Sequence, residues 1–365
     1  MKRASYFFLC ILFAFAVASC APSSSGKNGN SNLPDPASFR QQDNMKFFIE
    51  TGSCYYCMLN DKVYFSEKDQ PEFFLLCSKP NCTHNGSDCN AYADSGLGYS
   101  DGYLYGAVLF GGDPHLFQMS LDGSERRRIA TIEMPVNPAG TAGGAYEIYF
   151  HDGYAYYSVT NEGLNAFFRV ELATGKSERI LESLLRGDTQ LGVRVRFVGS
   201  KIYFLLYEQT RDACLYEANT NTLEYRKVRK WSSEICDWAV FDDVLYYYAS
   251  DRGTFCEYNL NTGEETTCLQ LDYYGGAANY DDDYIYLTTW DDDDFGGKGL
   301  SIFDQNYQFL QRVSYRPNQE LLYITQDKLI FTDLPSQKAT KYLPKSAIGT
   351  GKAELLPIED PYSYR

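Results

Sequence analysis

The sequence predicts an all-β protein, a β-propeller of seven blades that are each a four-stranded antiparallel sheet. Three observations favour this fold: a short apolar and aromatic strand that recurs along the chain, a hairpin pattern that follows most of its copies, and an abundance of aromatic residues. The 365 residues include 32 Tyr and 23 Phe, and aromatic side chains are enriched in strands.

The recurring strand follows a turn that contains Asp, Asn or Gly. Its seven copies read NDKVYFSE, SDGYLYGA, HDGYAYYSV, VGSKIYFLL, FDDVLYYYAS, DDDYIYLTT and TQDKLIFTD, and they are centred on Tyr64, Tyr105, Tyr156, Tyr203, Tyr246, Tyr286 and Ile330. The spacings run from 40 to 51 residues. Such a period is typical of propeller blades. Seven copies favour seven blades, although six or eight are also compatible with the period.

A second element follows the middle copies and reads as a hairpin. It appears as LFQMSLDGSE, FFRVELATGK, CLYEANTNTL, FCEYNLNTGE and LSIFDQNYQF, in which strand residues run into an Asn, Asp, Thr or Gly turn. A single small sheet cannot cover both of its faces, whereas a ring of sheets lets each face pack on its neighbour. A β-sandwich is the alternative, but it would not require this period. We expect KFFIETGSCYYC to complete the last blade and close the ring.

The N-terminal segment has the layout of a secretory signal. Lys2 and Arg3 precede an apolar stretch over 6–17, which is too short to span a bilayer as a helix. The ending VASC resembles the lipobox of bacterial lipoproteins, in which the chain is cut before a cysteine that then carries a diacylglycerol. This predicts a signal peptide over 1–19, a lipidated Cys20, and a protein anchored on the extracellular face of the cell membrane. The alternative is an ordinary signal peptide with an incidental cysteine.

The segment after Cys20 predicts a tether. Residues 20–44 are rich in Ser, Gly, Asn and Pro and nearly free of large apolar side chains, so they cannot bury enough surface to fold. The propeller domain is then expected over 45–365. The net charge of −15 argues against a nucleic-acid partner, since phosphate binding needs clustered Lys and Arg.

Several strands carry a family resemblance. VYFSE, YYSVT and LYYYASD resemble loosened forms of the Tyr-Trp-Thr-Asp propeller repeat. The body over about 45–360 is similar to uncharacterised Tyr-Trp-Thr-Asp-like or TolB-like propeller lipoproteins of anaerobic Gram-positive bacteria, which often carry a Cys/Pro/Cys/His/Cys segment. The resemblance implies a propeller fold and a surface location, and it implies no known reaction.

That segment here is CSKPNCTHNGSDC, from Cys77 to Cys89. By register, EFFLLCS matches LFQMSLD of the next repeat, so Cys77 is expected to end a strand and the rest to form an enlarged hairpin turn. As a metal site, Cys77, Cys82, His84 and Cys89 supply a Cys3His set that suits structural zinc. As disulfides, Cys82 would pair with Cys89, and Cys77 with Cys54 or Cys57, which an exported location favours. A catalytic centre is the third reading, but nothing here places a base beside a nucleophile.

Other cysteines read as structural. In FCEYNLNTGEETTC, a three-residue turn at 261–263 would place Cys256 opposite Cys268, within disulfide reach. Cys214 occupies the equivalent position one blade earlier, and its expected partner is Cys236 or none.

Two acidic runs are candidate calcium sites. YDDDY contains Asp281–Asp283, and WDDDDFGG contains Trp290 followed by Asp291, Asp292, Asp293 and Asp294. Calcium takes several carboxylate oxygens, but a solvated turn is the more usual role of a charge run. The second run is also long enough to shape a ligand mouth.

The features combine into a functional hypothesis. We expect a membrane-anchored, non-enzymatic propeller that binds a glycan, a peptide or an envelope partner. The first alternative is a propeller hydrolase or lyase that acts on glycans through channel carboxylates. The second alternative is a scaffold in an envelope complex.

Overall fold

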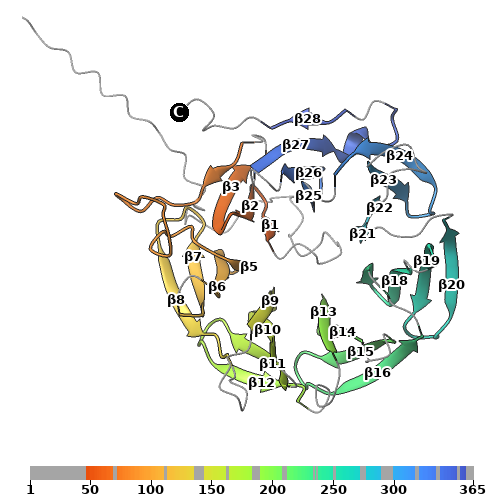
Figure 1. Ribbon diagram of the computed structural model, residues 1–365, viewed down its shortest axis with the longest axis horizontal. Helices are drawn as coiled ribbons and strands as arrows, with labels where there is room; N and C mark the ends of the chain where they lie inside the picture. Colours follow the sequence, from red (N-terminus) through yellow and green to blue (C-terminus); the bar gives the residue numbers. More distant parts are fainter. Residues whose placement is uncertain are drawn as a thin grey trace, which may run out of the picture.

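Seven four-stranded antiparallel sheets stand around a ring, as the blades of a propeller (Figure 1). The computed structural model describes residues 47–68, 72–110, 113–134, 144–161, 164–182, 190–207, 212–232, 235, 237–249, 252–271, 277–288, 299–316, 320–333, 338–351 and 354–358. Within these ranges the one helical element is the 3-10 turn η2 (Lys345–Ala347). None of the described segments forms a helix long and apolar enough to cross a bilayer. The predicted seven-bladed propeller is confirmed.

The strands follow the chain blade by blade. Blade 1 holds β1 (Phe48–Glu50), β2 (Cys54–Leu59), β3 (Lys62–Glu67) and β4 (Phe74–Leu75), and blade 2 holds β5 (Ser95–Ser100), β6 (Tyr103–Val108), β7 (His115–Ser120) and β8 (Arg126–Thr131). Blade 3 holds β9 (Gly144–His151), β10 (Tyr154–Asn161), β11 (Leu164–Glu171) and β12 (Ser177–Ile180), and blade 4 holds β13 (Gln190–Val198), β14 (Lys201–Tyr207), β15 (Ala213–Asn219) and β16 (Tyr225–Trp231). Blade 5 holds β17 (Asp237–Phe241), β18 (Val244–Ala249), β19 (Thr254–Asn259) and β20 (Glu265–Gln270). Blade 6 holds β21 (Ala277–Tyr280), β22 (Tyr284–Thr288), β23 (Gly299–Asp304) and β24 (Phe309–Ser314), and blade 7 holds β25 (Glu320–Ile324), β26 (Lys328–Asp333), β27 (Lys338–Pro344) and β28 (Leu356–Pro357).

The recurring Asp-Gly pairs form the turns between first and second strands. Asp101 and Asp152 have φ of 50°, and the glycines that follow them have φ of 80° and 79°. Two consecutive residues with positive φ make the tight turn whose twist suits a hairpin. Asp tolerates this conformation and Gly adopts it without strain. The Asp-Gly pairs in the sequence therefore mark the turns of the inner hairpins.

The hydrophobic core lies between the blades. Seven clusters of buried residues each join two successive sheets, and the last joins blade 7 to blade 1. Between blades 2 and 3, for example, Tyr105 and Leu116 pack with Tyr157 and Phe168. Each sheet thus covers its two faces with its two neighbours, as the repeat predicted.

Blade 1 departs from the predicted register. Tyr64 lies in β3, the third strand, whereas the centres of the other six copies lie in second strands. The NDK turn of the first copy connects the second and third strands of its blade. The SDGY turn connects the first and second strands, so the predicted alignment of the two copies is shifted by one strand. The expectation that KFFIETGSCYYC completes the last blade is wrong, because β1 and β2 begin blade 1 and β28 completes blade 7.

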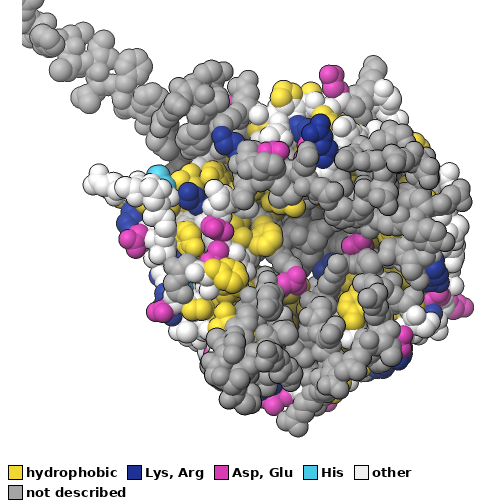
Figure 2. Space-filling view, in the orientation of Figure 1, with side chains coloured by type: hydrophobic (Ala, Val, Ile, Leu, Met, Phe, Trp, Pro, Cys, Tyr) yellow, Lys and Arg dark blue, Asp and Glu magenta, His cyan; other side chains and the backbone are white. Residues whose placement is uncertain are grey.

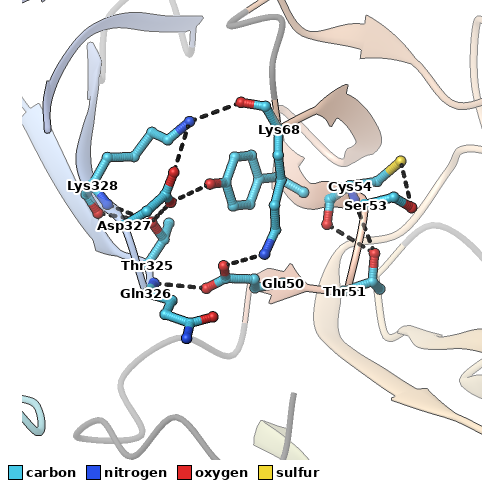
Figure 3. A network of polar contacts seen from close by, with 10 residues as sticks. Glu50, Thr51, Ser53, Cys54, Lys68, Thr325, Gln326, Asp327 and Lys328 are labelled. Atoms are coloured by element: carbon cyan, nitrogen blue, oxygen red, sulfur yellow. Dashed lines mark hydrogen bonds and ion pairs between the residues drawn. The ribbon is translucent and has the colours of Figure 1, made fainter. Parts of the chain in front are cut away.

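Blades 7 and 1 therefore meet without exchanging a strand. Phe48 of β1 stacks on Tyr323 of β25 with ring centroids 4.9 Å apart. A polar network crosses the same seam (Figure 3). Glu50 accepts bonds from Lys68 Nζ at 2.6 Å and from the Gln326 backbone N–H at 2.8 Å. Lys328 Nζ donates to the Lys68 carbonyl at 2.9 Å. The ring is closed here by side chains.

Candidate metal centre

The cysteine-rich segment connects β4 of blade 1 to β5 of blade 2, so its predicted place in a hairpin turn is wrong. β4 has only two residues, but the chain continues along the path of a fourth strand. A Cβ on Gly123 in the β7–β8 turn would lie 2.6 Å from the Leu76 carbonyl oxygen. A Cβ on Gly175, one blade later, would lie equally close to the carbonyl of Ile129 in β8. Leu76 thus corresponds to the middle of a fourth strand, and Cys77 leaves the sheet directly after it.

Four side chains of this connector converge. The Sγ atoms of Cys77, Cys82 and Cys89 and a ring nitrogen of His84 all lie within 4.8 Å of one another. Cys89 Sγ and His84 Nδ1 are 3.5 Å apart. Around a tetrahedral zinc with ordinary bond lengths, sulfur and nitrogen would lie about 3.6 Å apart and two sulfurs about 3.8 Å. A small contraction of the cluster would meet this geometry, so the cluster could hold a metal ion.

Left-handed backbone positions make this convergence feasible over a short connector. Asn81 and His84 have φ of 60° and 56°, and Gly86 has φ of 94°. Asn and Gly are the residues that adopt this region most readily. Asn81 turns the chain just before Cys82, and Gly86 turns it back toward Cys89. A side chain at His84 with positive φ is unusual and is here part of the cluster.

Backbone amides are directed at two of the sulfurs. The N–H groups of Lys79 and Asn90 donate to Cys77, and the N–H of Ala91 donates to Cys89. Burial opposes ionisation of Cys77, but these hydrogen bonds outweigh it and lower the pKa of the Cys77 thiol. Burial and the neighbouring Cys77 raise the pKa of Cys89 to about 12. Ionisation of Cys89 is therefore unfavourable at neutral pH without a nearby cation, and binding of a metal ion there would release its proton.

Arg126 of β8 ties the connector to blade 2. Its Nη1 donates to the carbonyl oxygens of Cys89, Asn90 and Tyr92 at 3.1, 3.3 and 2.6 Å. The guanidinium carbon lies 3.8 Å from the centroid of the Phe117 ring. Burial lowers the pKa of Arg126 to about 10, which leaves the side chain charged at neutral pH. The sequence showed only an Arg-rich strand here and gave no signal of this contact.

Of the predicted disulfide partners, Cys82 and Cys89 lie together in the cluster, with their Sγ atoms within 4.8 Å of each other, whereas neither Cys54 nor Cys57 belongs to it. Among the residues that the structure describes, no disulfide is formed by Cys54, Cys57, Cys77, Cys82, Cys89, Cys214, Cys256 or Cys268. Cys54 and Cys57 face opposite sides of their sheet, since Cys54 packs toward blade 2 and Cys57 toward blade 7.

Cys256 lies opposite Thr267, so its predicted pairing with Cys268 is wrong. Leu260 belongs to the turn, which makes the turn one residue longer than predicted, and a β-bulge leaves Cys268 between the paired residues. Similar bulges interrupt the outer hairpins of blades 2, 4 and 6, and a bulge adds one residue to one strand of a pair. The longer turn alone places Thr267 opposite Cys256, and the bulge lies beyond that pair. Cys214 lies opposite Lys230.

Several predicted residues lie outside the described ranges. These are Cys20, Cys236, Trp290, Asp291, Asp292, Asp293 and Asp294, so the lipidation site, the second acidic run and the predicted ligand mouth stay predictions.

The first acidic run contributes a buried ion pair between blades, and its calcium binding stays a prediction. Asp281 is fully buried and forms an ion pair with Lys345 Nζ at 2.8 Å. Tyr286 also donates its hydroxyl to Asp281 at 2.7 Å. Burial raises the pKa of Asp281, and the lysine opposes that shift. The carboxylate that the calcium hypothesis needed therefore joins blade 6 to blade 7.

Carboxylates on the inner strands take part in structural contacts. Asp237 of β17 accepts the Ala278 N–H of the neighbouring blade at 3.0 Å. Glu320 of β25 accepts the Arg316 N–H at 2.8 Å and pairs with Lys341 at 2.7 Å. Glu50 of β1 is held in the seam described above. Asp237 and Glu50 thus join neighbouring blades, and Glu320 is paired with a lysine of its own blade.

Comparison with known proteins supports the architecture. No protein-family model and no curated protein sequence matches the chain. Among solved structures, the computationally designed Ika8 protein has a TM-score of 0.51 at 10% identity, covering 86% of this chain and 96% of that one. A puromycin hydrolase has a TM-score of 0.58 at 14% identity over 86% of this chain and 54% of its own, so this chain matches about half of that enzyme. BamB from Moraxella catarrhalis has a TM-score of 0.43 at 13% identity, covering 80% of this chain and 81% of that one. At these identities the likeness establishes the propeller fold alone.

Proposed function

We propose that this protein is a lipid-anchored extracellular propeller that acts as a non-enzymatic binding module, and that a structural Zn²⁺ holds its first interblade connector. The observation that carries the proposal is the convergence of three cysteines and one histidine within 4.8 Å on a connector between blades. Four protein ligands complete a tetrahedral shell and leave no open position for a substrate, which is typical of structural zinc and not of catalytic zinc.

A brace is needed at this connector because the local sheet is incomplete. β4 contributes only two residues to blade 1, whereas β8 contributes six to blade 2. The segment that follows β4 cannot obtain ladder hydrogen bonds along its full length. Metal ligation compensates for that loss and fixes the chain before it enters β5.

The anchor and the binding role are supported by the sequence. The lipobox-like VASC and the polar segment after Cys20 favour a folded body tethered outside a membrane. The resemblance to propeller lipoproteins agrees with this location. The structural use of Asp237, Glu320 and Glu50 favours binding over glycan hydrolysis, which needs two carboxylates that are free to act on substrate.

The zinc proposal is tested on protein purified without reductant or chelator. We expect about one zinc per chain by elemental analysis, with loss of the metal in Cys77→Ser and Cys89→Ser. Cys256→Ser and Cys268→Ser are matched controls that should keep it. A metal content near zero in the wild type, or a disulfide within 77–89 found by mass spectrometry, would refute the zinc brace.

The anchor is tested separately in cells. Labelling with a fatty-acid analogue should mark the wild type and not Cys20→Ser, and only the wild type should remain with the membrane. The binding role is tested by capture of envelope glycans and of envelope proteins in parallel. If neither is captured by zinc-loaded protein, the scaffold alternative replaces the binding module.

A further inference from the structure

A groove lies beside the metal centre, on the outer part of blade 2. It has a volume of about 480 Å³. One wall comes from the connector through Lys79 and Asn90, and the rest comes from β6, β7 and β8 and the turn between β7 and β8. A volume in this range is typical of sites for small ligands. Figure 2 shows basic and acidic side chains along the rim of the molecule on the side of these strands.

The groove is positively charged on an acidic protein. Lys79, Arg126 and Arg127 line it, and Glu125 is its one acidic lining residue. The chain as a whole carries −15. A local excess of cations against that background favours an anionic ligand, because attraction within the groove opposes repulsion from the rest of the surface.

Its lining also suits a ring with hydroxyl groups. Tyr103 is 43% exposed, and its hydroxyl has no hydrogen-bond partner among the residues that the structure describes. Gln118 is held in place, since its Nε2 donates to Tyr105 Oη at 2.9 Å and its Oε1 accepts from Arg127 Nε at 2.5 Å. Arg127 retains further N–H donors beyond Nε. An aromatic face beside fixed planar polar groups offers both apolar contact and directed hydrogen bonds.

The groove wall is connected to the metal centre through two residues. The backbone amides of Lys79 and Asn90 are the two that donate to the Cys77 sulfur. The Asn90 side chain also donates to the carbonyl oxygens of Gly123 at 3.0 Å and Ser124 at 3.1 Å, across to the β7–β8 turn. A metal on Cys77 would therefore fix the positions of both connector residues that line the groove.

From these contacts we propose that the groove binds an acidic saccharide, a sugar unit that carries a carboxylate or a phosphate, and that metal loading of the connector organises the site. Arg127 and Lys79 pair with the anionic group, and Tyr103 packs against the sugar ring. The inference rests on the proposed binding function and names its site and ligand class.

The test is calorimetric titration of the zinc-loaded full-length chain in detergent. The probes are an oligosaccharide of uronic acids, a sugar-phosphate oligomer and a neutral oligosaccharide of equal length. We expect at least one of the two acidic probes to bind at least about tenfold more tightly than the neutral one, a difference that corresponds to about 1.4 kcal/mol. The comparison of carboxylate with phosphate identifies the source of the charge. Equal affinity for the neutral probe would overturn the proposal, as would no binding of either acidic probe.

Two pairs of variants locate the site. Arg127→Ala and Tyr103→Ala should each weaken binding about tenfold, the loss expected for one charge-assisted bond or one stacking contact. Arg128→Ala and Tyr99→Ala are the matched controls, because these residues lie on the same strand or the adjacent strand and do not line the groove. Losses of equal size in the controls would place the ligand elsewhere.

Zinc removal tests whether the metal organises the groove. Chelated protein that still gives the far-ultraviolet spectrum of the wild type should bind the acidic sugar at least about tenfold more weakly. Unchanged affinity after chelation would refute the coupling to the metal. If zinc-loaded protein captures an envelope component but no acidic sugar, the groove assignment fails and the binding function survives.

Discussion

The connector between blades 1 and 2 and the seam between blades 7 and 1 join neighbouring sheets by different means. At the connector the chain is continuous, but its strand is short, and three sulfurs and an imidazole converge. At the seam no described strand is shared between the blades, and stacked rings with a network of hydrogen bonds hold the blades together. The ring thus closes by packing where no strand is shared, and the proposed metal would compensate for the incomplete fourth strand of blade 1.

The largest effect is expected from the apolar part of the seam. Phe48 is 2% exposed and stacks on Tyr323. Phe48→Ala should lower the free energy of unfolding by about 3–5 kcal/mol, the usual cost of emptying such a site. The neighbouring Phe47, which is 37% exposed, gives the control Phe47→Ala. Urea unfolding measures both, and equal losses would mean that the seam does not depend on this stack.

A smaller loss is expected from removing the metal. Cys77→Ser or Cys89→Ser should destabilise the protein by roughly 2–4 kcal/mol, the range for loss of a native cross-link. Addition of a zinc chelator should lower the melting temperature of the wild type and leave the variants unchanged. If the chelator acts equally on wild type and variants, the metal that it removes is not bound by these thiols.

Arg126 tests how much the connector depends on contacts other than the metal, because its side chain joins β8 to the connector. Arg126→Lys keeps the charge but loses the planar guanidinium that contacts three carbonyls and Phe117. We expect a loss of about 1–3 kcal/mol from the unsatisfied carbonyls. Arg128→Lys, on the same strand and with a side chain that is 45% exposed, should cost little. Zinc content should persist in both variants, which separates this tie from the metal ligands.

The polar part of the seam should respond to pH. Burial alone would raise the pKa of Asp327, but the hydrogen bond from Tyr55 and the charge of Lys328 hold it below the ordinary value of about 3.9. The stability that this carboxylate contributes is therefore present above that value and is lost as pH falls through the lower folded value. Asp327→Asn should be less stable than wild type near pH 7, and the difference should shrink below about pH 4. Thermal unfolding across pH 3–7 measures it, and a constant difference would assign the effect to packing.

The repeat made the fold predictable, because seven aromatic strands at regular spacing leave faces that only neighbouring blades can cover. The same repeat misplaced blade 1, since a short turn at 60–61 resembles the Asp-Gly turns but joins different strands. The hairpin count misplaced Cys268, because the turn of that hairpin is one residue longer than the residue pattern indicates. Long-range contacts such as Lys345 with Asp281, and Arg126 with the connector, depend on how blades meet in space.

Of the candidate site, the ligand types were predictable and the choice among partners was not. Three cysteines and a histidine within thirteen residues indicate either metal or disulfides. The separation of Cys54 and Cys57 onto opposite faces, and the amides directed at Cys77, favour the metal. Neither feature can be read from spacing. The groove beside the cluster was missed for the same reason, because its walls come from the connector and from three strands of blade 2.

The metal centre is tested by X-ray absorption at the zinc edge of the purified full-length protein. We expect one zinc bound by three sulfurs at about 2.3 Å and one imidazole nitrogen at about 2.0–2.1 Å. In His84→Ala a light-atom ligand should replace the imidazole, and the three sulfurs should remain. A shell of oxygen and nitrogen alone, or four sulfurs, would contradict the Cys77, Cys82, His84 and Cys89 assignment.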